Sequence, residues 1–520
     1  MSTPASTPAT ITVGGTPLRP DEVVSVARDG VEVALDPDAV VAIEQARHTI
    51  DKLAASSQPA YGVSTGFGSL ATTHIDPSKR GQLQRSLVRS HAAGAGAHVE
   101  REVVRATMLL RLATLATGHT GVRVSTAQSL AGLLNAQITP AVHEYGSLGC
   151  SGDLAPLAHC ALALMGEGEV YVAGETDPRP AAEALSAHGL TPVELQEKEG
   201  LALINGTDGM LGMLVLALAD LRLLVTTADV AAAMSIEGLL GTDRVLAADL
   251  QALRPHPGQA DSAANMRAVL AGSAIVHSHR GPEDPRVQDA YSLRCAPQVH
   301  GAARDTATHC TTVAERELAS AVDNPVVLED GRVESNGNFH GAPVAYALDF
   351  LAIPVADLAS ISERRTDRFL DVARNHGLPA FLADDPGVDS GHMIAQYTQA
   401  AIVSELKRLA APASVDSIPS SAMQEDHVSM GWSAARKLRR SVDGLAHVLA
   451  IELLTAARGI DLRRPLRPAP PTAAVIGALR EHVPGPGPDR YLAPEIEVAF
   501  DLVRTGAIRA AAETVTGELR

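Results

Sequence analysis

Cysteine, aromatic residues and positive charge are all scarce in this chain of 520 residues. Its four cysteines are Cys150, Cys160, Cys295 and Cys310, and no two of them form a Cys-x-x-Cys pair. A disulfide framework and a zinc ribbon are therefore not expected, and the sparse thiols suit a reducing cytoplasm. Aromatic residues make up only 3% of the chain. That composition disfavours a β-sandwich and suits closely packed helices of small aliphatic residues.

The charge balance is acidic, with 43 Lys and Arg against 60 Asp and Glu, a formal net charge of −17. A nucleic-acid partner is not expected, because such a protein needs a basic face. The first fifteen residues lack the basic and apolar segments of a secretory signal. The most apolar stretch, 210–234, is interrupted by Asp220, Arg222 and Asp229. Charges in mid-bilayer are costly, so we expect a buried helix there and no membrane partner.

Helical periodicity dominates the rest of the sequence. Asp36, Pro37 and Asp38 have the order of a capped helix start. Strand signals are few: a short arm at 169–175 and a tight hairpin at 326–333. The absence of a regular βαβ alternation argues against Rossmann and TIM architectures. We expect a mainly α fold with long helices in a bundle, over residues 39–55, 81–91, 99–116, 124–137, 153–165, 209–240, 289–322, 343–369, 391–409, 432–457 and 494–519.

The expected organisation has a loose Thr/Pro-rich tail and three helical regions. Proline-rich and Pro/Gly-rich segments near the C-terminus indicate connectors there. The expected parts are a tail at 1–18, an N-terminal region at 19–208, a central long-helix bundle at 209–463 and a C-terminal helical region at 464–520.

Residues 61–68 form a glycine-rich loop that carries Tyr61. A P-loop would need a preceding strand and a Gly-Lys-Ser/Thr sequence, and neither is present. The loop is therefore either a surface turn or a loop that closes over a site and carries Tyr61. His91, at the end of the next helical segment, is by itself more typical of a structural histidine.

The most informative segment is 146–156, where Ser151 stands between Cys150 and Gly152. The nucleophile elbow of a serine hydrolase would need Gly-x-Ser-x-Gly after a strand, which is not the order here. Without a Cβ, the backbone nitrogen of Gly152 can approach the carbonyl of Cys150 and close a five-membered ring. Loss of water from the ring and from Ser151 would leave an exocyclic methylene, an electrophile that no ordinary side chain supplies. A tight turn in which Asp153 caps the next helix is the alternative.

Three later segments concentrate polar side chains. Asn205 stands beside a glycine, and Gln288, Tyr291 and Arg294 are spaced three apart, as on one helix face. An arginine in such a cluster binds a carboxylate in bidentate fashion, and a tyrosine transfers a proton; a hydrogen-bonded surface face is the alternative. The loop at 336–341 contains Phe339, and 423–430 concentrates acids around Glu425. Ligand spacing for a metal is absent there, so we expect no metal and no nucleotide.

Together, in this order, these segments resemble the aromatic amino acid ammonia-lyases over nearly the whole chain. The resemblance implies an α fold of the aspartase/fumarase type, with a smaller N-terminal active-site region. It also implies a homotetramer with shared active sites and a 4-methylidene-imidazol-5-one (MIO) group built from Cys150, Ser151 and Gly152.

The same resemblance implies roles for individual residues. Tyr61 would serve as base or proton relay at the substrate β-carbon, with Ser151, Tyr291 and Glu425 as further catalytic residues. Asn205 would stabilise charge on the ring oxygen. The residues implied to bind substrate are His91, Asn205, Gln288, Arg294 and Phe339. His91 and Glu425 would contact the imidazole ring of the substrate.

Three positions depart from the family pattern. Cys150 replaces the usual Ala of the tripeptide, which places a thiol next to the electrophile. Ser64 stands where Asn is frequent, and Asp208 where Gln is frequent after Asn-Gly-Thr. None of these changes removes the atoms that would close the ring.

The reaction implied is the elimination of ammonia from L-histidine to give urocanate, the first step of histidine degradation. Two alternatives remain open at this point. The ring could serve a tyrosine or phenylalanine ammonia-lyase or an aminomutase, since His91 could also hydrogen-bond a phenol. The chain could also be a helical bundle that lacks the chemistry, with an unaltered Ser151.

Overall fold

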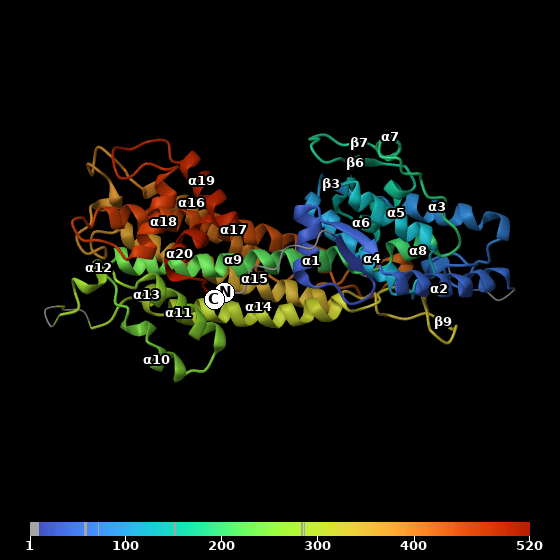
Figure 1. Ribbon diagram of the computed structural model, residues 1–520, viewed down its shortest axis with the longest axis horizontal. Helices are drawn as coiled ribbons and strands as arrows, with labels where there is room; N and C mark the ends of the chain where they lie inside the picture. The colour runs from blue at the N-terminus through green and yellow to red at the C-terminus, as the bar shows by residue number, and fades with distance from the viewer. Residues whose placement is uncertain (1–9, 57–59, 71, 150–151, 282–283, 285–286) are drawn as a thin grey trace. The chain divides into compact units, whose positions relative to one another are not determined.

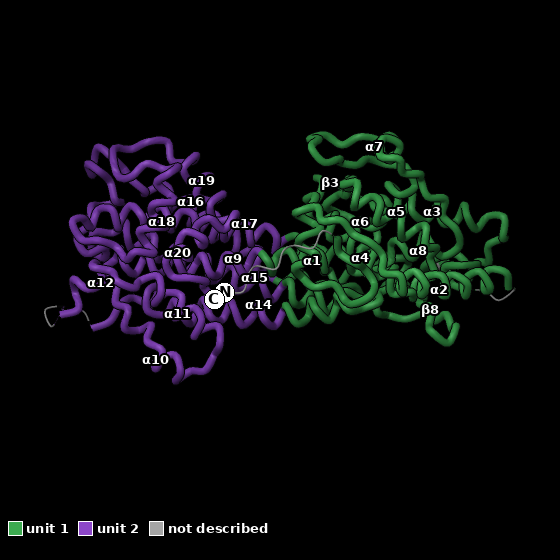
Figure 2. Tube along the Cα trace, viewed as in Figure 1, with its two compact units in different colours: residues 1–219, 311–348, 412–436 green, residues 220–310, 349–411, 437–520 purple. Residues whose placement is uncertain are grey.

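The structure is a computed structural model that describes residues 10–56, 60–70, 72–149, 152–281, 284 and 287–520. The chain forms two compact units built from interleaved segments (Figure 2). Unit 1 comprises Met1–Ala219, Thr311–Leu348 and Pro412–Arg436. Unit 2 comprises Asp220–Cys310, Asp349–Ala411 and Lys437–Arg520. Helices make up most of both units, which confirms the predicted mainly α class.

The helices of unit 1 begin largely where the sequence predicts. Asp36 accepts a hydrogen bond from the backbone N–H of Asp38, and Pro37 occupies the first position of helix α2. The helices confined to unit 1 are α1 (Pro20–Val24), α2 (Pro37–Ala55), α3 (Arg80–His91), α4 (Arg101–Ala116), α5 (Val124–Asn135), α6 (Leu154–Leu164), α7 (Ala181–Ala187) and α8 (Glu199–Ile204).

Packing of α3, α6 and α8 against one another determines where the site lies (Figure 1). The end of α3 carries His91, α6 begins two residues after Gly152, and Asn205 follows the last residue of α8. Helix α4, which is buried along most of its length, packs on α5 and α6. A helix that is buried on nearly all sides acts as a fixed core element for its neighbours.

Strands are short and pair only in small sheets. Strands β1 (Thr10–Val13) and β2 (Glu32–Leu35) are parallel, although composition predicts a loose tail up to residue 18. The Thr-Ile-Thr-Val alternation explains the difference, since it buries Ile11 and Val13. The other strands are β3 (Ala95–His98), β4 (Thr139–Pro140), β5 (His143–Tyr145), β6 (Glu169–Tyr171), β7 (Arg179–Pro180), and the predicted hairpin β8 (Val326–Val327) and β9 (Val333–Glu334).

Four long helices contribute to both units: α9 (Asp208–Gly238), α14 (Ala296–Leu318), α15 (Ala342–Leu370) and α17 (Gly431–Asp461). Helices α9 and α15 are apolar and long enough to cross a membrane. In the helical segment Glu199–Gly238, which includes α9, 78% of the 18-residue apolar window is buried inside the protein. Two of its charges are paired within the protein, Asp220 with Arg439 and Asp229 with Arg304, and Arg222 is exposed. The buried helix predicted around 210–234 is confirmed.

Two of the predicted helices are interrupted. The segment predicted as one helix over 289–322 is the four-residue α13 (Tyr291–Arg294) followed by α14, and Gln288 precedes both. The C-terminal prediction is divided at Gly506, whose φ of +80° suits glycine and ends the continuous helix. The helices confined to unit 2 are α10 (Ala248–Ala252), α11 (Pro257–Val269), α12 (Ala274–His277), α13, α16 (Met393–Leu409), α18 (Pro470–Arg480), α19 (Ala493–Arg504) and α20 (Ala507–Thr516).

Candidate active site

A cavity of about 540 Å³ lies in unit 1 beside α3, α6 and α8. Four of the residues predicted for the site line it: Tyr61, His91, Asn205 and Glu425. Leucine and isoleucine side chains supply much of the remaining wall, from Leu83 and Leu87 of α3, Leu154 of α6, and Leu201 and Ile204 of α8. An apolar cavity with a few convergent polar groups is typical of a small-molecule site.

Tyr61 is held in the glycine-rich loop by a backbone contact. The N–H of Gly68 donates to the Tyr61 hydroxyl oxygen at 3.1 Å, and the ring packs edge-on against Phe67. Burial raises the pKa of Tyr61, and the charge of Glu425 raises it further. Because Gly68 occupies only an acceptor position, the hydroxyl proton of Tyr61 remains available for donation in the neutral form. The loop therefore positions Tyr61 at the wall of the cavity.

His91 is the last residue of α3. Its Nδ1 lies 2.9 Å from the carbonyl oxygen of Leu87 and 3.1 Å from the hydroxyl of Ser90. Because a carbonyl oxygen only accepts, Nδ1 carries the proton and Nε2 keeps its lone pair. Burial lowers the pKa of His91, with a smaller opposing influence from Glu425, so the neutral form is favoured. His91 is thus prepared to accept a hydrogen bond through Nε2.

Glu425 follows a turn with unusual backbone conformation. Ser421, Ala422 and Met423 all have positive φ, between +50° and +70°, which costs energy in non-glycine residues. Backbone hydrogen bonds between Ser420 and Glu425 close the turn, and the Ser420 hydroxyl donates to the Glu425 carboxylate at 2.8 Å. A half-buried carboxylate is thereby fixed at the cavity wall.

Cys150 and Ser151 lie outside the described residues, but the residues on either side are closely held. The Ser429 hydroxyl donates to the carbonyl of Gly149 at 2.9 Å. Gly152 has a φ of +82°, and a Cβ there would lie 2.0 Å from the carbonyl oxygen of Gly206. Only glycine fits at 152, which satisfies a requirement of the ring chemistry inferred from the sequence.

Asp153 has a different role from the cap that the sequence predicts. Its side chain makes no hydrogen bond to its own helix α6. It accepts instead from the N–H of Met210 in the first turn of α9 at 2.8 Å, and from the Ser147 hydroxyl. Burial raises the pKa of Asp153 to about 7. Asp153 therefore caps α9 and joins that helix to the tripeptide segment, a long-range contact that local spacing does not reveal.

Asn205 is almost fully buried behind the cavity. Its Nδ2 donates to the carbonyl of Asn324 at 2.9 Å, while Oδ1 is buried without a hydrogen-bond partner among the described residues. Asn324 also lines the cavity and was missed by the sequence analysis. The Asn-Pro dipeptide at 324–325 marks a turn, but only tertiary structure brings that turn next to Asn205.

The remaining predicted site residues do not line this cavity. Gln288, Tyr291 and Arg294 belong to unit 2, where the Arg294 guanidinium donates to Gln288 Oε1 and lies 4.6 Å from the ring centroid of Tyr291. Tyr291 is 70% exposed. Gln288 precedes α13, so the prediction that all three share one helix face is wrong. Phe339 is half-buried in a unit 1 loop.

The family of aromatic amino acid lyases matches residues 18–481. The chain belongs to this family. A relative from Streptomyces coelicolor, named histidine ammonia-lyase, is 67% identical and spans 98% of this chain and 100% of its own length. A histidine ammonia-lyase from Sorangium cellulosum is 49% identical over 97% of this chain and 99% of its own. The family resemblance inferred from the motifs is confirmed.

Solved structures of this lyase family have the same fold. The crystal structure of histidine ammonia-lyase from Trypanosoma cruzi is 40% identical, with a TM-score of 0.90 over 98% of this chain and 96% of its own. A tyrosine aminomutase from Streptomyces globisporus is 38% identical, with a TM-score of 0.92 over 98% of this chain and 100% of its own. One helical fold thus serves lyase and aminomutase relatives, and side chains in the site have to distinguish the reactions.

Proposed function

We propose that this protein eliminates ammonia from L-histidine to give urocanate, the reaction of a histidine ammonia-lyase. The observation that carries the proposal is the presence of His91 and Glu425 in the same cavity as Tyr61. Relatives named histidine ammonia-lyase, 66% to 67% identical over nearly the full chain, support it.

The residues present fit an MIO group formed from Cys150, Ser151 and Gly152. The close approach of Gly206 excludes a side chain on the α-carbon of Gly152, which adjoins the ring nitrogen. The amide of Asn205 is buried, with an oxygen that has no hydrogen-bond partner among the described residues. Because an α-amino group leaves poorly and a β-hydrogen is weakly acidic, the reaction needs an electron acceptor that ordinary side chains lack. The ring supplies that electrophile, and the chain's own residues bind and orient the substrate.

His91 and Glu425 orient the substrate imidazole. The unprotonated Nε2 of His91 accepts from an imidazole N–H, and the Glu425 carboxylate accepts from the other nitrogen when that carries a proton. Tyr61 stands on the loop next to them and serves as the proton acceptor or relay for the β-hydrogen. Its raised pKa favours the protonated hydroxyl at neutral pH, so Tyr61 takes up the β-hydrogen only as it passes its own hydroxyl proton on.

The substrate carboxylate is bound by Arg294, with Tyr291 in the catalytic set and Gln288 and Phe339 lining the site. These side chains reach the cavity in a homotetramer whose active sites are shared between subunits. The exposed Tyr291, together with exposed apolar side chains at Phe350 and Ile353 of α15, suits such an assembly. A cytoplasmic location, without nucleic-acid or membrane partners, belongs to the same proposal and is supported by the scarcity of cysteine and the acidic charge.

Tyrosine aminomutase activity is the second candidate, because the fold of that relative matches so closely. The Glu425 carboxylate argues against it. A phenyl or phenol ring offers at most one polar atom, so the half-buried carboxylate would lose hydration without an adequate partner. An imidazole supplies two nitrogens, which His91 and Glu425 can share.

Two measurements on the purified protein test the proposal. Intact mass determines whether the chain weighs two water molecules less than its sequence requires, as ring formation predicts. Urocanate formation from L-histidine is followed by its ultraviolet absorbance, with L-tyrosine and L-phenylalanine as parallel substrates. A ring-bearing protein that makes no urocanate and converts tyrosine to a cinnamate or β-tyrosine would overturn the histidine assignment. An unmodified mass would overturn the chemistry altogether.

A further inference from the structure

Arg111 of α4 is a buried cation that the proposed reaction does not use. It is 2% exposed and donates from all three of its guanidinium nitrogens. Nη1 donates to the carbonyls of Ala202 and Asn205 at 2.9 and 3.1 Å, and Nη2 donates to Val322 O at 3.3 Å. The carbonyls at the end of α8 lack partners within the helix, so Arg111 stabilises the position at which α8 ends and Asn205 begins.

Asp208 balances the charge of Arg111. Its Oδ2 accepts from Arg111 Nε at 3.1 Å and from Nη2 at 2.6 Å. Asp208 is also the first residue of α9, where the helix dipole favours a negative charge. Burial raises the pKa of Asp208, and the guanidinium opposes that rise.

The pair lies directly against the turn at Gly206. A Cβ on Gly206 would lie 1.7 Å from Arg111 Nη2 and 2.4 Å from Asp208 Oδ2. On the other side of the turn, the carbonyl oxygen of Gly206 accepts from the N–H of Asp153 at 2.6 Å and would lie 2.0 Å from a Cβ on Gly152. The turn therefore fills the space between the ion pair and the last residue of the tripeptide.

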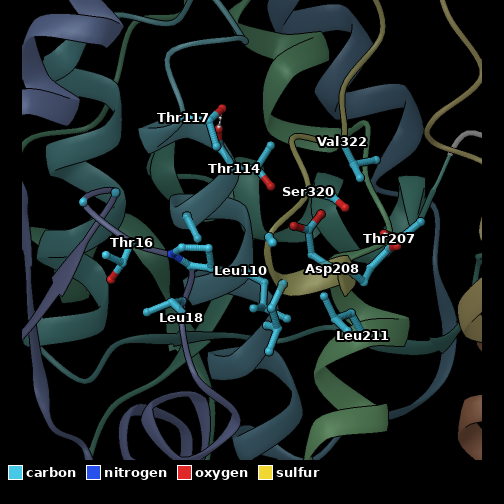
Figure 3. A pocket seen from close by; sticks show the side chains of 17 residues that line it. Thr16, Leu18, Leu110, Thr114, Thr117, Thr207, Asp208, Leu211, Ser320 and Val322 are labelled. Carbon is cyan, nitrogen blue, oxygen red and sulfur yellow. Dashed lines mark hydrogen bonds between the residues drawn. The ribbon is translucent and has the colours of Figure 1, made fainter. Parts of the chain in front are cut away.

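Asp208 also borders a second cavity of about 250 Å³, together with Leu110, Thr114 and Leu211 (Figure 3). The carboxylate of Asp208 is fixed by its ion pair with Arg111. The free space also means that a changed side chain at 208 need not clash.

We propose that Arg111 and Asp208 are positioning residues that press the Asn205–Gly206 turn against Gly152. They touch neither substrate nor ring, and act through the turn on the geometry in which the tripeptide cyclises and Asn205 faces the ring. This inference rests on the proposed function, because it assumes that the tripeptide forms the ring. Displacements of about 1 Å in such supporting structure reduce turnover about a hundredfold.

The test compares Arg111→Lys and Asp208→Ala with Arg105→Lys. Arg105 is a matched control: it is a buried arginine of the same helix, and it donates to the carbonyls of Val26 and Leu134. For each protein, intact mass gives the fraction of chains that carry the ring, and steady-state kinetics gives kcat per ring-bearing site and KM. Thermal unfolding shows how far each substitution destabilises the fold.

We expect Arg111→Lys and Asp208→Ala to lower the ring fraction, or kcat per ring, by about ten- to a hundredfold relative to Arg105→Lys. KM should stay within about threefold, because the pair does not bind substrate. A ring fraction and a kcat within about twofold of the control would overturn the proposal. If Arg111→Lys does not fold, Asp208→Ala decides the question, since it keeps the guanidinium and its carbonyl contacts.

Failure of the proposed function is distinguishable from failure of this inference. Wild-type protein that carries the ring but makes no urocanate contradicts the histidine assignment only. The ring fraction of the variants is measured without any substrate, so it still tests the positioning role in that case.

Discussion

The two groups of predicted site residues differ in how they are supported. In unit 1, Tyr61, His91 and Asn205 are each held by backbone groups of their own chain within one cavity. In unit 2, Tyr291 is largely exposed, and Arg294 contacts mainly its neighbours Gln288 and Tyr291. The unit 1 group is preorganised by one chain, whereas Tyr291 of the unit 2 group is exposed, as the proposed sharing of sites between subunits requires.

The largest effect is expected within the unit 1 group. Ser151→Ala removes the hydroxyl that becomes the electrophilic methylene, so urocanate formation should fall by at least about a thousandfold. Thermal unfolding should remain close to wild type, because the proposed role of this hydroxyl is in the chemistry of the ring. Kinetics and intact mass check both points, and near-normal turnover in this variant would contradict the role of Ser151.

Mixing subunits tests whether the two groups combine between chains. Tyr61→Phe damages the unit 1 group and Arg294→Met the unit 2 group, and each variant alone should lose about a hundredfold in kcat/KM. If sites are shared, random co-assembly restores an intact pair of groups in about a quarter of the sites. Activity should therefore return when the two variants are co-expressed.

The control is co-expression of two copies of the same variant, which should restore no activity. No recovery in the mixed assembly, with tetramers shown by light scattering, would mean that both groups serve the site within one chain.

A smaller effect is expected at the wall of the unit 1 cavity. Glu425→Gln keeps the shape but removes the charge, which should lower kcat/KM for L-histidine about tenfold to a hundredfold through loss of a charge-assisted hydrogen bond. Asp426→Asn is the matched control, because that neighbouring carboxyl is exposed and does not line the cavity. Equal kcat/KM values for the two variants would contradict the proposed role of Glu425 in binding the substrate.

The smallest effect concerns pH and the partly buried imidazole of His159. His159 Nε2 accepts from the N–H of Gly94 at 3.2 Å, and burial, with His143 and His98 nearby, lowers the pKa of His159 from 6.5 to about 4. Between these values the unfolded chain binds the proton more readily than the folded chain, so the free energy of unfolding falls as pH drops from about 6.5 to 4. Above pH 6.5 this contribution is constant.

Denaturant unfolding of wild type and His159→Gln across this range checks the prediction. The variant should show a shallower decline, because it lacks the histidine that must be protonated. An identical pH dependence in both proteins would show that His159 does not contribute.

Periodicity predicted most of the fold because the helices are amphipathic or capped locally. Asp36 and its proline specify the start of α2 in consecutive residues. Local signals failed where one glycine or one tertiary contact decides: Gly506 divides the last helix, and Ile11 and Val13 become a buried strand only by pairing with β2. The predicted limits at 18, 208 and 463 remain predictions.

For the site, the residues carried by motifs were found in sequence, and four of them line one cavity. Asn324 and Arg111 were not found, because their signal is spatial: each reaches Asn205 across 94 positions or more of chain. Asp153 carries a local capping signal but caps a helix that starts 55 positions later. Sequence spacing identifies the reacting groups more readily than the groups that hold them.

The contact between Ser429 and Gly149 bridges 280 positions. During synthesis the N-terminal part emerges from the ribosome first, so the tripeptide is exposed well before its distant hydroxyl partner has been translated. A nascent chain that stops short of residue 429 lacks the hydroxyl that donates to the carbonyl of Gly149, next to the proposed ring. If ring closure needs this hydrogen bond, the alkene forms only after residue 429 has been translated.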